Sequence, residues 1–241
     1  MNWAAVVPVK GNPGAKSRFG THPERAQLAE AFAMDTVAAL LASPAVARVL
    51  VVTADAQLAT KLAALGATIV RELPQKPPST AAKGAFVATH EPAERHEPAE
   101  PPNPPDPLNA AIRQGMDAAR QACPDANIAV VTGDLPALTV ADVEAAIALA
   151  AAHERSMVPD AEGMGTTMLL ALAGASFTPQ FGPGSRAAHE AAGHMPLELP
   201  AIASIRRDVD TPDNLAEARR LGVGRYTAAL IEGTSATPSV R

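Results

Sequence analysis

The residues best suited to chemistry lie between Ile128 and Pro136, where an apolar run leads directly into an acidic residue. Such a run predicts a parallel strand buried on both faces, and an open α/β sheet places its ligand at the carboxyl ends of these strands. Pro136 stops the strand from continuing, which leaves the Asp134 carboxylate at the edge of the sheet. A carboxylate there can hold a hard divalent cation such as Mg²⁺, which usually accompanies phosphates, although Asp is also a common turn residue.

A second acidic segment, Arg206 to Pro212, carries Asp208 and Asp210. One residue separates the two carboxylates, so both can face the same side of an extended segment. Asp210 can instead cap the helix that follows, and Thr211 competes with it for that position. The segment therefore offers two further carboxylates suited to a cation.

A basic loop follows the first predicted strand and contains Lys10, Lys16 and Arg18 among small, turn-forming residues. Backbone amides and positive charge at the carboxyl end of a strand form a phosphate-binding arrangement, unless the loop is an ordinary basic surface loop. A Walker P-loop is not matched, because Ala15 precedes Lys16 and Gly11 is too close to it. A dinucleotide fingerprint is not matched either, because no acidic residue follows at the expected distance on a second strand.

Neutral hydrogen-bond donors are concentrated in two further loops, Gly163–Thr167 and Phe181–Ser185. The first loop is predicted to lead into a strand and the second into a helix. Their glycines and hydroxyls supply N–H and O–H groups suited to a small anion, although both loops can also be plain tight turns. Two acidic loops and a basic loop are what nucleotidyl transfer requires. Carboxylates hold a metal that bridges the phosphates, and cations neutralise the departing pyrophosphate.

The segments between these loops alternate strand and helix patterns. The predicted strands are Trp3 to Val9, Val46 to Thr53, Ala67 to Val70, Ile128 to Asp134, Ser156 to Pro159 and Thr166 to Ala173. The predicted helices are Leu28 to Leu41 behind a capping box at Thr21–Glu24, Ala56 to Leu65, Pro107 to Cys123, Thr139 to His153, and a last helix from Thr211 to the Gly222 stop. This order predicts an α/β fold with a mostly parallel sheet and helices on both faces.

Residues 1–230 are predicted to form one domain, which a proline-rich insertion at 72–105 interrupts. The insertion cannot bury enough apolar surface to offset its ordering entropy, so we expect a flexible excursion in which His90 and His96 are solvated. Residues 231–241 are expected to be a disordered tail.

Composition excludes several classes of protein. A length of 241 residues with 47% hydrophobic and 19% charged residues is typical of a globular protein. The net charge of −5 argues against nucleic-acid binding, and no apolar run reaches the ~20 residues that span a membrane. Cys123 is the single cysteine, which excludes an internal disulfide and a multi-cysteine zinc site. Because there is no signal-peptide pattern, we expect a cytoplasmic protein.

Taken in order, the motifs resemble those of the guanylyltransferase family that activates phosphoenolpyruvate or 2-phospho-L-lactate in the biosynthesis of coenzyme F(420). The motifs that carry the resemblance are Val7–Lys10 with Ala15–Arg18, Asp106–Ile112, Gly133–Leu138, Gly165–Thr166, Phe181–Ser185 and Asp208–Pro212. They span about residues 3 to 230. The proline-rich insertion departs from the family, because it is longer than expected there.

The resemblance implies a Rossmann-like nucleotidyltransferase fold of the molybdopterin-guanylyltransferase type that uses GTP and Mg²⁺. Carried over by position, the site residues fall into four groups. The metal ligands are Asp134, Asp208 and Asp210; the catalytic residues are Lys16, Arg18 and Asp134; the acceptor-binding residues are Thr166, Gly182 and Ser185; and the nucleotide-binding residues are Lys10, Lys16, Arg18, Asp106 and Asn109.

The reaction implied by the resemblance joins a small phosphorylated acid to GMP from GTP and releases pyrophosphate. Phosphoenolpyruvate is the favoured acceptor, because the alanine-rich composition and the Phe181–Ser185 loop resemble the actinobacterial type. The alternative acceptors are 2-phospho-L-lactate and 3-phospho-D-glycerate. A sugar or molybdopterin nucleotidyltransferase is a related alternative, but the first loop lacks a Leu-Ala-Gly-Gly start. A non-catalytic nucleotide-binding regulatory module is disfavoured by the retained carboxylates, and the oligomeric state is left open, a homodimer included.

Overall fold

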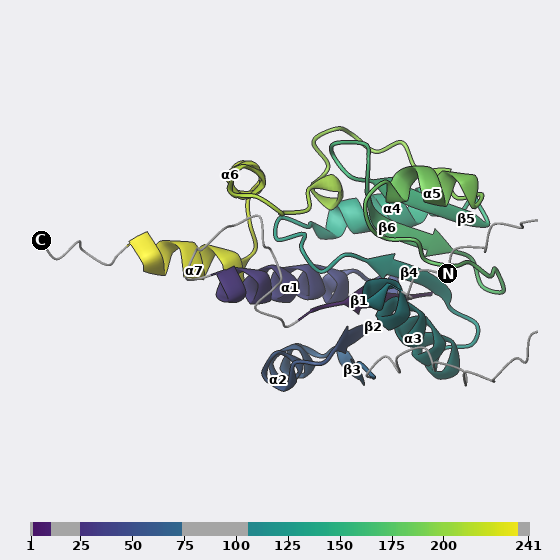
Figure 1. The fold of residues 1–241 in the computed structure, drawn as a ribbon, viewed down its shortest axis with the longest axis horizontal. Helices are drawn as coiled ribbons and strands as arrows, with labels where there is room; N and C mark the ends of the chain where they lie inside the picture. Colours follow the sequence, from purple (N-terminus) through teal and green to yellow (C-terminus); the bar gives the residue numbers. More distant parts are fainter. Residues whose placement is uncertain (1, 11–24, 74–105, 236–241) are drawn as a thin grey trace, which may run out of the picture.

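A computed structural model of the chain describes residues 2–10, 25–73 and 106–235. Within these residues, seven strands form one sheet in the order β3-β2-β1-β4-β6-β5-β7 (Figure 1). The strands are β1 (Trp3–Pro8), β2 (Val46–Thr53), β3 (Thr68–Arg71), β4 (Asn127–Val131), β5 (Arg155–Pro159), β6 (Thr166–Ala171) and β7 (Met195–Pro196). The helices are α1 (Arg25–Ala42), α2 (Ala56–Leu65), α3 (Pro107–Ala122), α4 (Val140–Ala150), α5 (Ser185–Ala191), α6 (Pro212–Leu221) and α7 (Arg225–Ser235), with a 3-10 turn η2 at Ser204–Arg206.

Strand β6 runs against the other strands of the described sheet. It pairs antiparallel with β4 and β5, whereas β1 to β4 are parallel to one another and β5 is parallel to β7. Strands β4 and β5 therefore point the same way, and the carboxyl ends of β1, β4 and β5 meet the amino end of β6 at one edge. The prediction of a mostly parallel sheet is confirmed.

Alternate residues of the central strands contribute to two apolar cores, one on each face of the sheet. In β1, Ala5 and Val7 belong to the core that includes α1, α2 and α4, whereas Val6 packs with α3. Helices therefore cover both faces, as predicted. The close approach of α3 depends on Gly115, because a Cβ atom there would lie 2.5 Å from the Val6 side chain and 2.6 Å from that of Val52.

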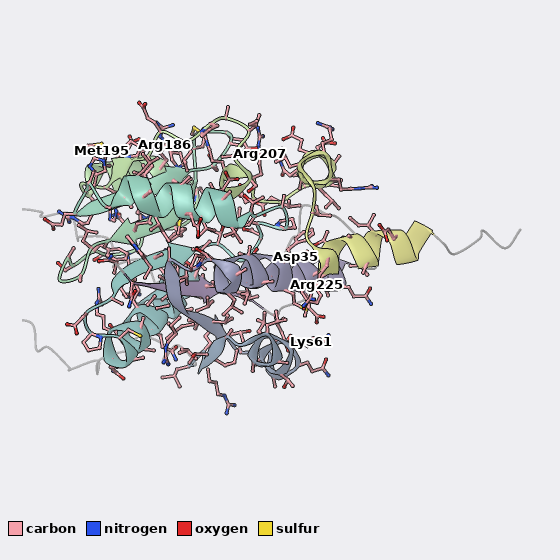
Figure 2. The ribbon with its side chains drawn as sticks, turned by 180° about the vertical axis from the view of Figure 1, so that it is seen from behind. Asp35, Lys61, Arg186, Met195, Arg207 and Arg225 are labelled. Atoms are coloured by element: carbon pink, nitrogen blue, oxygen red, sulfur yellow. The ribbon has the colours of Figure 1, made fainter. Side chains whose placement is uncertain are left out.

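Helix α7 is docked on α1 through a carboxylate. Asp35 is buried in α1, and its oxygens accept hydrogen bonds from the backbone N–H groups of Tyr226 at 3.0 Å and Thr227 at 2.9 Å. The first N–H groups of a helix have no partner within it, so Asp35 caps α7 from another element. Figure 2 labels Asp35 beside Arg225, where the two helices meet, and α7 continues beyond the end of α1 (yellow in Figure 1).

The observed elements agree with the predicted strands and helices to within a few residues. The sequence patterns did not predict β7 or α7. The expected disordered tail at 231–241 is helical as far as Ser235, because α7 is capped and packed by α1, and the remainder lies outside the described residues. The capping box at 21–24 and residues 74–105 of the insertion, with their two histidines, also lie outside. Among the described helices, none has both the length and the hydropathy of a membrane span.

Both ends of the proline-rich insertion are attached to α3. The Gln114 side chain accepts a hydrogen bond from Leu73 N–H at 3.1 Å and donates one to the Arg71 carbonyl at 2.5 Å. At the other end, Asp106 caps the first turn of the same helix. Asp106 and Gln114 are eight positions apart, so the two attachments lie roughly 12 Å apart along the helix. A short linker is long enough to join them.

Candidate active site

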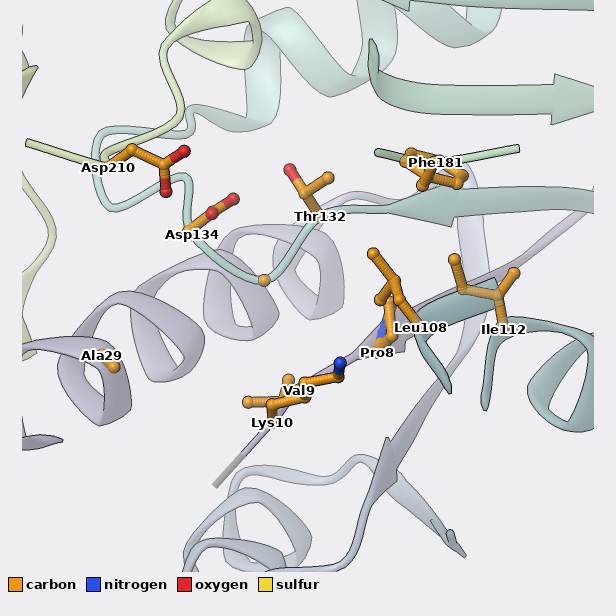
Figure 3. Close-up of a pocket in the computed structure, with 11 residues that line it drawn as sticks. Pro8, Val9, Lys10, Ala29, Leu108, Ile112, Thr132, Asp134, Phe181 and Asp210 are labelled. Atoms are coloured by element: carbon orange, nitrogen blue, oxygen red, sulfur yellow. The ribbon is translucent and has the colours of Figure 1, made fainter. Parts of the chain in front are cut away.

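A cavity of about 230 Å³ opens at the edge of the sheet where β1 and β4 end (Figure 3). Its described lining combines apolar side chains with one cationic and two acidic residues. The lining residues are Pro8, Val9, Lys10, Ala29, Leu108, Ile112, Thr132, Gly133, Asp134, Phe181 and Asp210. Apolar walls with a few convergent charged groups are typical of ligand sites, and this edge is where an α/β sheet binds its ligand.

The loop that carries Asp134 is anchored on two sides. The Thr36 hydroxyl of α1 accepts a hydrogen bond from Leu135 N–H at 3.0 Å. The Asp134 carbonyl accepts one from Val209 N–H, also at 3.0 Å. The second bond places the acidic segment 206–210 beside Asp134, so carboxylates from distant parts of the chain meet at the cavity.

Asp208 lies within a group of carboxylates. Its pKa is raised from the ordinary value of 3.8 to about 8, chiefly by burial and then by the charges of its neighbours. Those neighbours are, in order of effect, Asp134, Asp210, Asp160 and Glu162. Because the charged form of Asp208 is unfavourable among them, a cation at this position would stabilise it.

Asp210 lines the cavity and does not cap helix α6. The N-cap is Thr211, whose hydroxyl accepts a hydrogen bond from Asn214 N–H at 3.2 Å within a capping box. Of the two capping residues that the sequence allowed, Asp210 and Thr211, the structure therefore has Thr211 at the N-cap. In Figure 3 the carboxylates of Asp134 and Asp210 point into the same space.

Two carboxylates beside Asp208 were missed by the sequence patterns. Asp160 and Glu162 form a group with Asp208 in which one ligand oxygen from each residue lies within 4.8 Å of the others. Asp160 directly follows β5. An acidic residue at the end of a predicted strand was the sequence signal that could have identified it as a site residue. Its oxygens accept hydrogen bonds from Met164 N–H at 2.8 Å and Gly165 N–H at 2.7 Å. Asp160 therefore also closes the turn between β5 and β6.

The three predicted acceptor-binding residues lie in segments that the structure brings together. Thr166 begins β6 and is buried, with its hydroxyl oxygen 2.9 Å from Nδ1 of His189 in α5. Gly182 has a φ of 136°, a conformation that favours glycine. Ser185 is buried at the start of α5, where its N–H donates to the Gly182 carbonyl at 3.1 Å. Their binding of an acceptor stays a prediction.

Asp106 and Asn109, predicted near the nucleotide, bond to protein groups. One Asp106 oxygen accepts a hydrogen bond from Leu108 N–H at 3.0 Å, and the other accepts one from Asn109 Nδ2 at 2.8 Å. The buried Asn109 amide also donates to the Phe181 carbonyl and accepts from the Phe181 N–H, both at 2.8 Å. Neither predicted residue is among the described lining of the cavity, whereas their neighbours Leu108 and Phe181 are.

The structure describes one of the three predicted phosphate-binding cations. Lys10 follows β1, is exposed, and lines the cavity together with Asp134 and Asp210 (Figure 3). Lys16 and Arg18 lie outside the described residues. The cavity therefore presents both signs of charge, as a site for a metal-bound phosphate requires.

Known proteins resemble the chain along nearly its full length. The chain is 41% identical over 233 residues to the phosphoenolpyruvate guanylyltransferase of Streptomyces coelicolor, a match that covers 95% of this chain and 96% of the relative. It is 41% identical over 244 residues to the protein of that name from Salinispora arenicola, covering 99% and 97%. No protein-family model matches the chain.

Solved structures share the fold at low sequence identity. One described as a nucleotide-diphospho-sugar transferase from Desulfovibrio desulfuricans has a TM-score of 0.63 at 16% identity, covering 97% of this chain and 95% of the other. A 4-diphosphocytidyl-2C-methyl-D-erythritol synthase has a TM-score of 0.53 at 12% identity, covering 91% and 97%. The fold is the Rossmann-like nucleotidyltransferase fold that the sequence predicts.

Proposed function

Because the chain belongs to the phosphoenolpyruvate guanylyltransferase family, we propose that it transfers GMP from GTP to phosphoenolpyruvate and releases pyrophosphate. The product is enolpyruvyl-diphospho-guanosine, in the biosynthesis of coenzyme F(420). The observation that carries the proposal is the group of carboxylates around Asp208, beside a cavity at the carboxyl edge of the sheet. This arrangement suits a cation, a nucleotide and a second anion.

The donor set fits Mg²⁺, which prefers oxygen ligands. Asp134, Asp208 and Asp210 offer carboxylates from two neighbouring loops, and we assign the ion to them. The raised pKa of Asp208 supports the assignment, because it reflects negative charge that a divalent cation offsets. When bound, the ion would neutralise phosphate charge and help to orient the reacting phosphate. Asp160 also closes the turn between β5 and β6, and each of its oxygens keeps a lone pair that can contribute to the same cation.

We assign the cavity beside β1 and β4 to GTP. Val9, Leu108 and Ile112 form apolar walls against which the nucleoside can pack. Lys10 supplies positive charge at the same cavity, and Lys16 and Arg18 belong to the loop that follows it in sequence. These cations are assigned to the triphosphate, where positive charge stabilises the departing pyrophosphate.

The acceptor is assigned to Thr166, Gly182 and Ser185. A three-carbon acid with a phosphate and a carboxylate needs several donors but no large pocket, and small residues supply them without bulk. In the reaction, an oxygen of the acceptor phosphate attacks the α-phosphorus of GTP. The bond from that phosphorus to the bridging oxygen breaks, and pyrophosphate leaves with the electron pair. Positioning and charge neutralisation account for most of the catalysis of such transfers.

Pyrophosphate release, measured with GTP and each acceptor in turn, tests the proposal. Phosphoenolpyruvate should be the best acceptor, and release should require a divalent cation. A preference for 2-phospho-L-lactate or 3-phospho-D-glycerate would change only the acceptor. GTP binding without release from any acceptor would instead favour a nucleotide-binding regulatory module.

The variant Asp134→Asn tests the metal assignment. It should keep the fold and lose turnover, because it removes a carboxylate assigned to the ion. Circular dichroism reports the fold, and the pyrophosphate assay reports turnover. Wild-type release by a folded Asp134→Asn protein would reject the assignment.

A further inference from the structure

A buried histidine lies behind the acceptor loop, defined here as residues 180–185. His189 of α5 is 0% exposed, and its ring stands edge-on to that of Phe181 with the centroids 5.1 Å apart. A side chain this deeply buried cannot itself touch a substrate. Each of its ring nitrogens has a hydrogen-bond partner, and these partners define its tautomer.

The backbone N–H of Gln180 lies 3.0 Å from Nε2 of His189. A backbone N–H can only donate, so Nε2 must carry a lone pair. A neutral imidazole then carries its hydrogen on Nδ1, which donates to the Thr166 hydroxyl oxygen at 2.9 Å. Burial, and to a lesser degree the charge of His194, lowers the pKa of His189 to about 4, so the ring is neutral near pH 7.

One ring therefore joins three segments. It bonds to Thr166 at the start of β6, to Gln180 two residues before Gly182, and it belongs to the helix that begins at Ser185. These are the segments assigned to the acceptor under the proposed function. Because Thr166 accepts the hydrogen of Nδ1, its own hydroxyl hydrogen is directed elsewhere. Its described partner is the weakly accepting sulfur of Met157 at 3.7 Å.

We propose that His189 is a positioning residue for the acceptor site: its Nδ1–H tautomer fixes Thr166 and the backbone before Gly182 relative to Ser185. The proposal rests on the proposed function for the identity of the ligand. Displacing a binding group by about 1 Å can cost about a hundredfold in rate, so an indirect contact of this kind has a measurable effect.

Two substitutions separate positioning from simple loss of packing. His189→Leu removes both hydrogen bonds, and we expect the acceptor KM to rise about tenfold or more while the GTP KM stays within about twofold. His189→Asn keeps a donor near the place of Nδ1 and should recover part of the loss. His194→Leu is the control for packing, because the buried His194 ring stands edge-on to that of His189 with the centroids 5.6 Å apart, but its Nδ1 donates to the Ser156 carbonyl at 3.3 Å and to neither Thr166 nor Gln180. It should leave the acceptor KM within about twofold.

A folded His189→Leu protein with an unchanged acceptor KM, or with equal rises in both KM values, would overturn the proposal. The KM values are measured with whichever phosphorylated acid the wild type uses, so a wrong choice of acceptor does not affect the comparison.

Nitrogen-15 NMR of the histidine rings in the unaltered protein tests the tautomer without any turnover. The His189 ring, identified by the signals that His189→Asn lacks, should carry hydrogen on Nδ1 and none on Nε2, with and without phosphoenolpyruvate. A hydrogen on Nε2 would overturn the proposal even if the leucine variant failed to fold. A wild type that releases no pyrophosphate but keeps the expected tautomer would reject the proposed function and leave the geometry intact.

Discussion

Replacing Asp208 with asparagine removes one negative charge from the carboxylate group and leaves the size of the side chain nearly unchanged. In the metal-free protein that charge is unfavourable, since burial and the neighbouring carboxylates raise the pKa of Asp208 from 3.8 to about 8. We therefore expect Asp208→Asn to stabilise the metal-free protein. The same change should abolish pyrophosphate release, because Asp208 is assigned to the cation.

The sign and size of the effect follow from the raised pKa. The folded protein holds the Asp208 proton more tightly than the unfolded chain does, so this contribution to stability is present near pH 4 and is lost as the pH rises toward 8. Each unit of difference between the folded and unfolded pKa corresponds to about 1.4 kcal/mol of unfolding free energy. Solvent screens a partly exposed carboxylate and reduces this energy, so we expect Asp208→Asn to raise the free energy of unfolding by about 2 kcal/mol near pH 8. That corresponds to a rise in Tm of about 4–8 °C for a protein of this size.

Thermal unfolding in the presence of a chelator, at several pH values between about 4 and 8, measures the difference between variant and wild type. The difference should be largest at the alkaline end and vanish at the acidic end. Asp35→Asn is the matched control: both oxygens of Asp35 accept backbone N–H groups, so the same substitution should lower the Tm. An Asp208→Asn protein that melts at or below the wild-type temperature near pH 8 would refute the reasoning.

Three other variants test separate features. Asn109→Ala should raise the KM of both GTP and the acceptor, because its amide holds the backbone of Phe181, which lines the cavity assigned to GTP and belongs to the acceptor loop; unchanged KM values in a folded variant would contradict this role. Replacing residues 76–102 by a short Gly/Ser linker should leave pyrophosphate release within a few fold, since both attachments lie on α3, and a large loss in a folded variant would mean that the segment takes part in the reaction. Gly115→Ala should cost about 1–3 kcal/mol in denaturant unfolding despite the better helix propensity of alanine, and unchanged stability would contradict the close packing against Val6.

The central carboxylates could be predicted from the sequence because local patterns position them. The apolar run of β4 ends just before Asp134, and the Thr211–Pro212 pair marks the start of α6 and leaves Asp210 outside the helix. The end of β4 and the start of α6 each depend on residues only a few positions apart in the sequence. Asp160 follows β5 in a comparable way. Asp160 could be placed at the site only by knowing the strand directions: β6 is antiparallel to both β4 and β5, so the carboxyl end of β5 lies at the same edge of the sheet as that of β4.

The supporting contacts could not be predicted, because their partners are distant in sequence. The Asn109 amide bonds to the backbone 72 residues later, and Asp35 caps a helix whose first turn lies more than 190 residues away. No periodicity or capping rule relates such positions. For the same reason α7 was not predicted, since its cap is supplied by α1 and not by the residue before it.

The hydrogen bond from Val209 N–H to the Asp134 carbonyl has a consequence for the order in which the protein matures. One carboxylate-bearing segment follows strand β4 and the other precedes helix α6, and the whole β5–β6 hairpin lies between them in the chain. During synthesis, a chain that has emerged as far as β4 still lacks Asp208 and Asp210. The cation assigned to these carboxylates would therefore have its full set of proposed ligands only after the chain has emerged through residue 210 and Val209 has docked on the loop that carries Asp134.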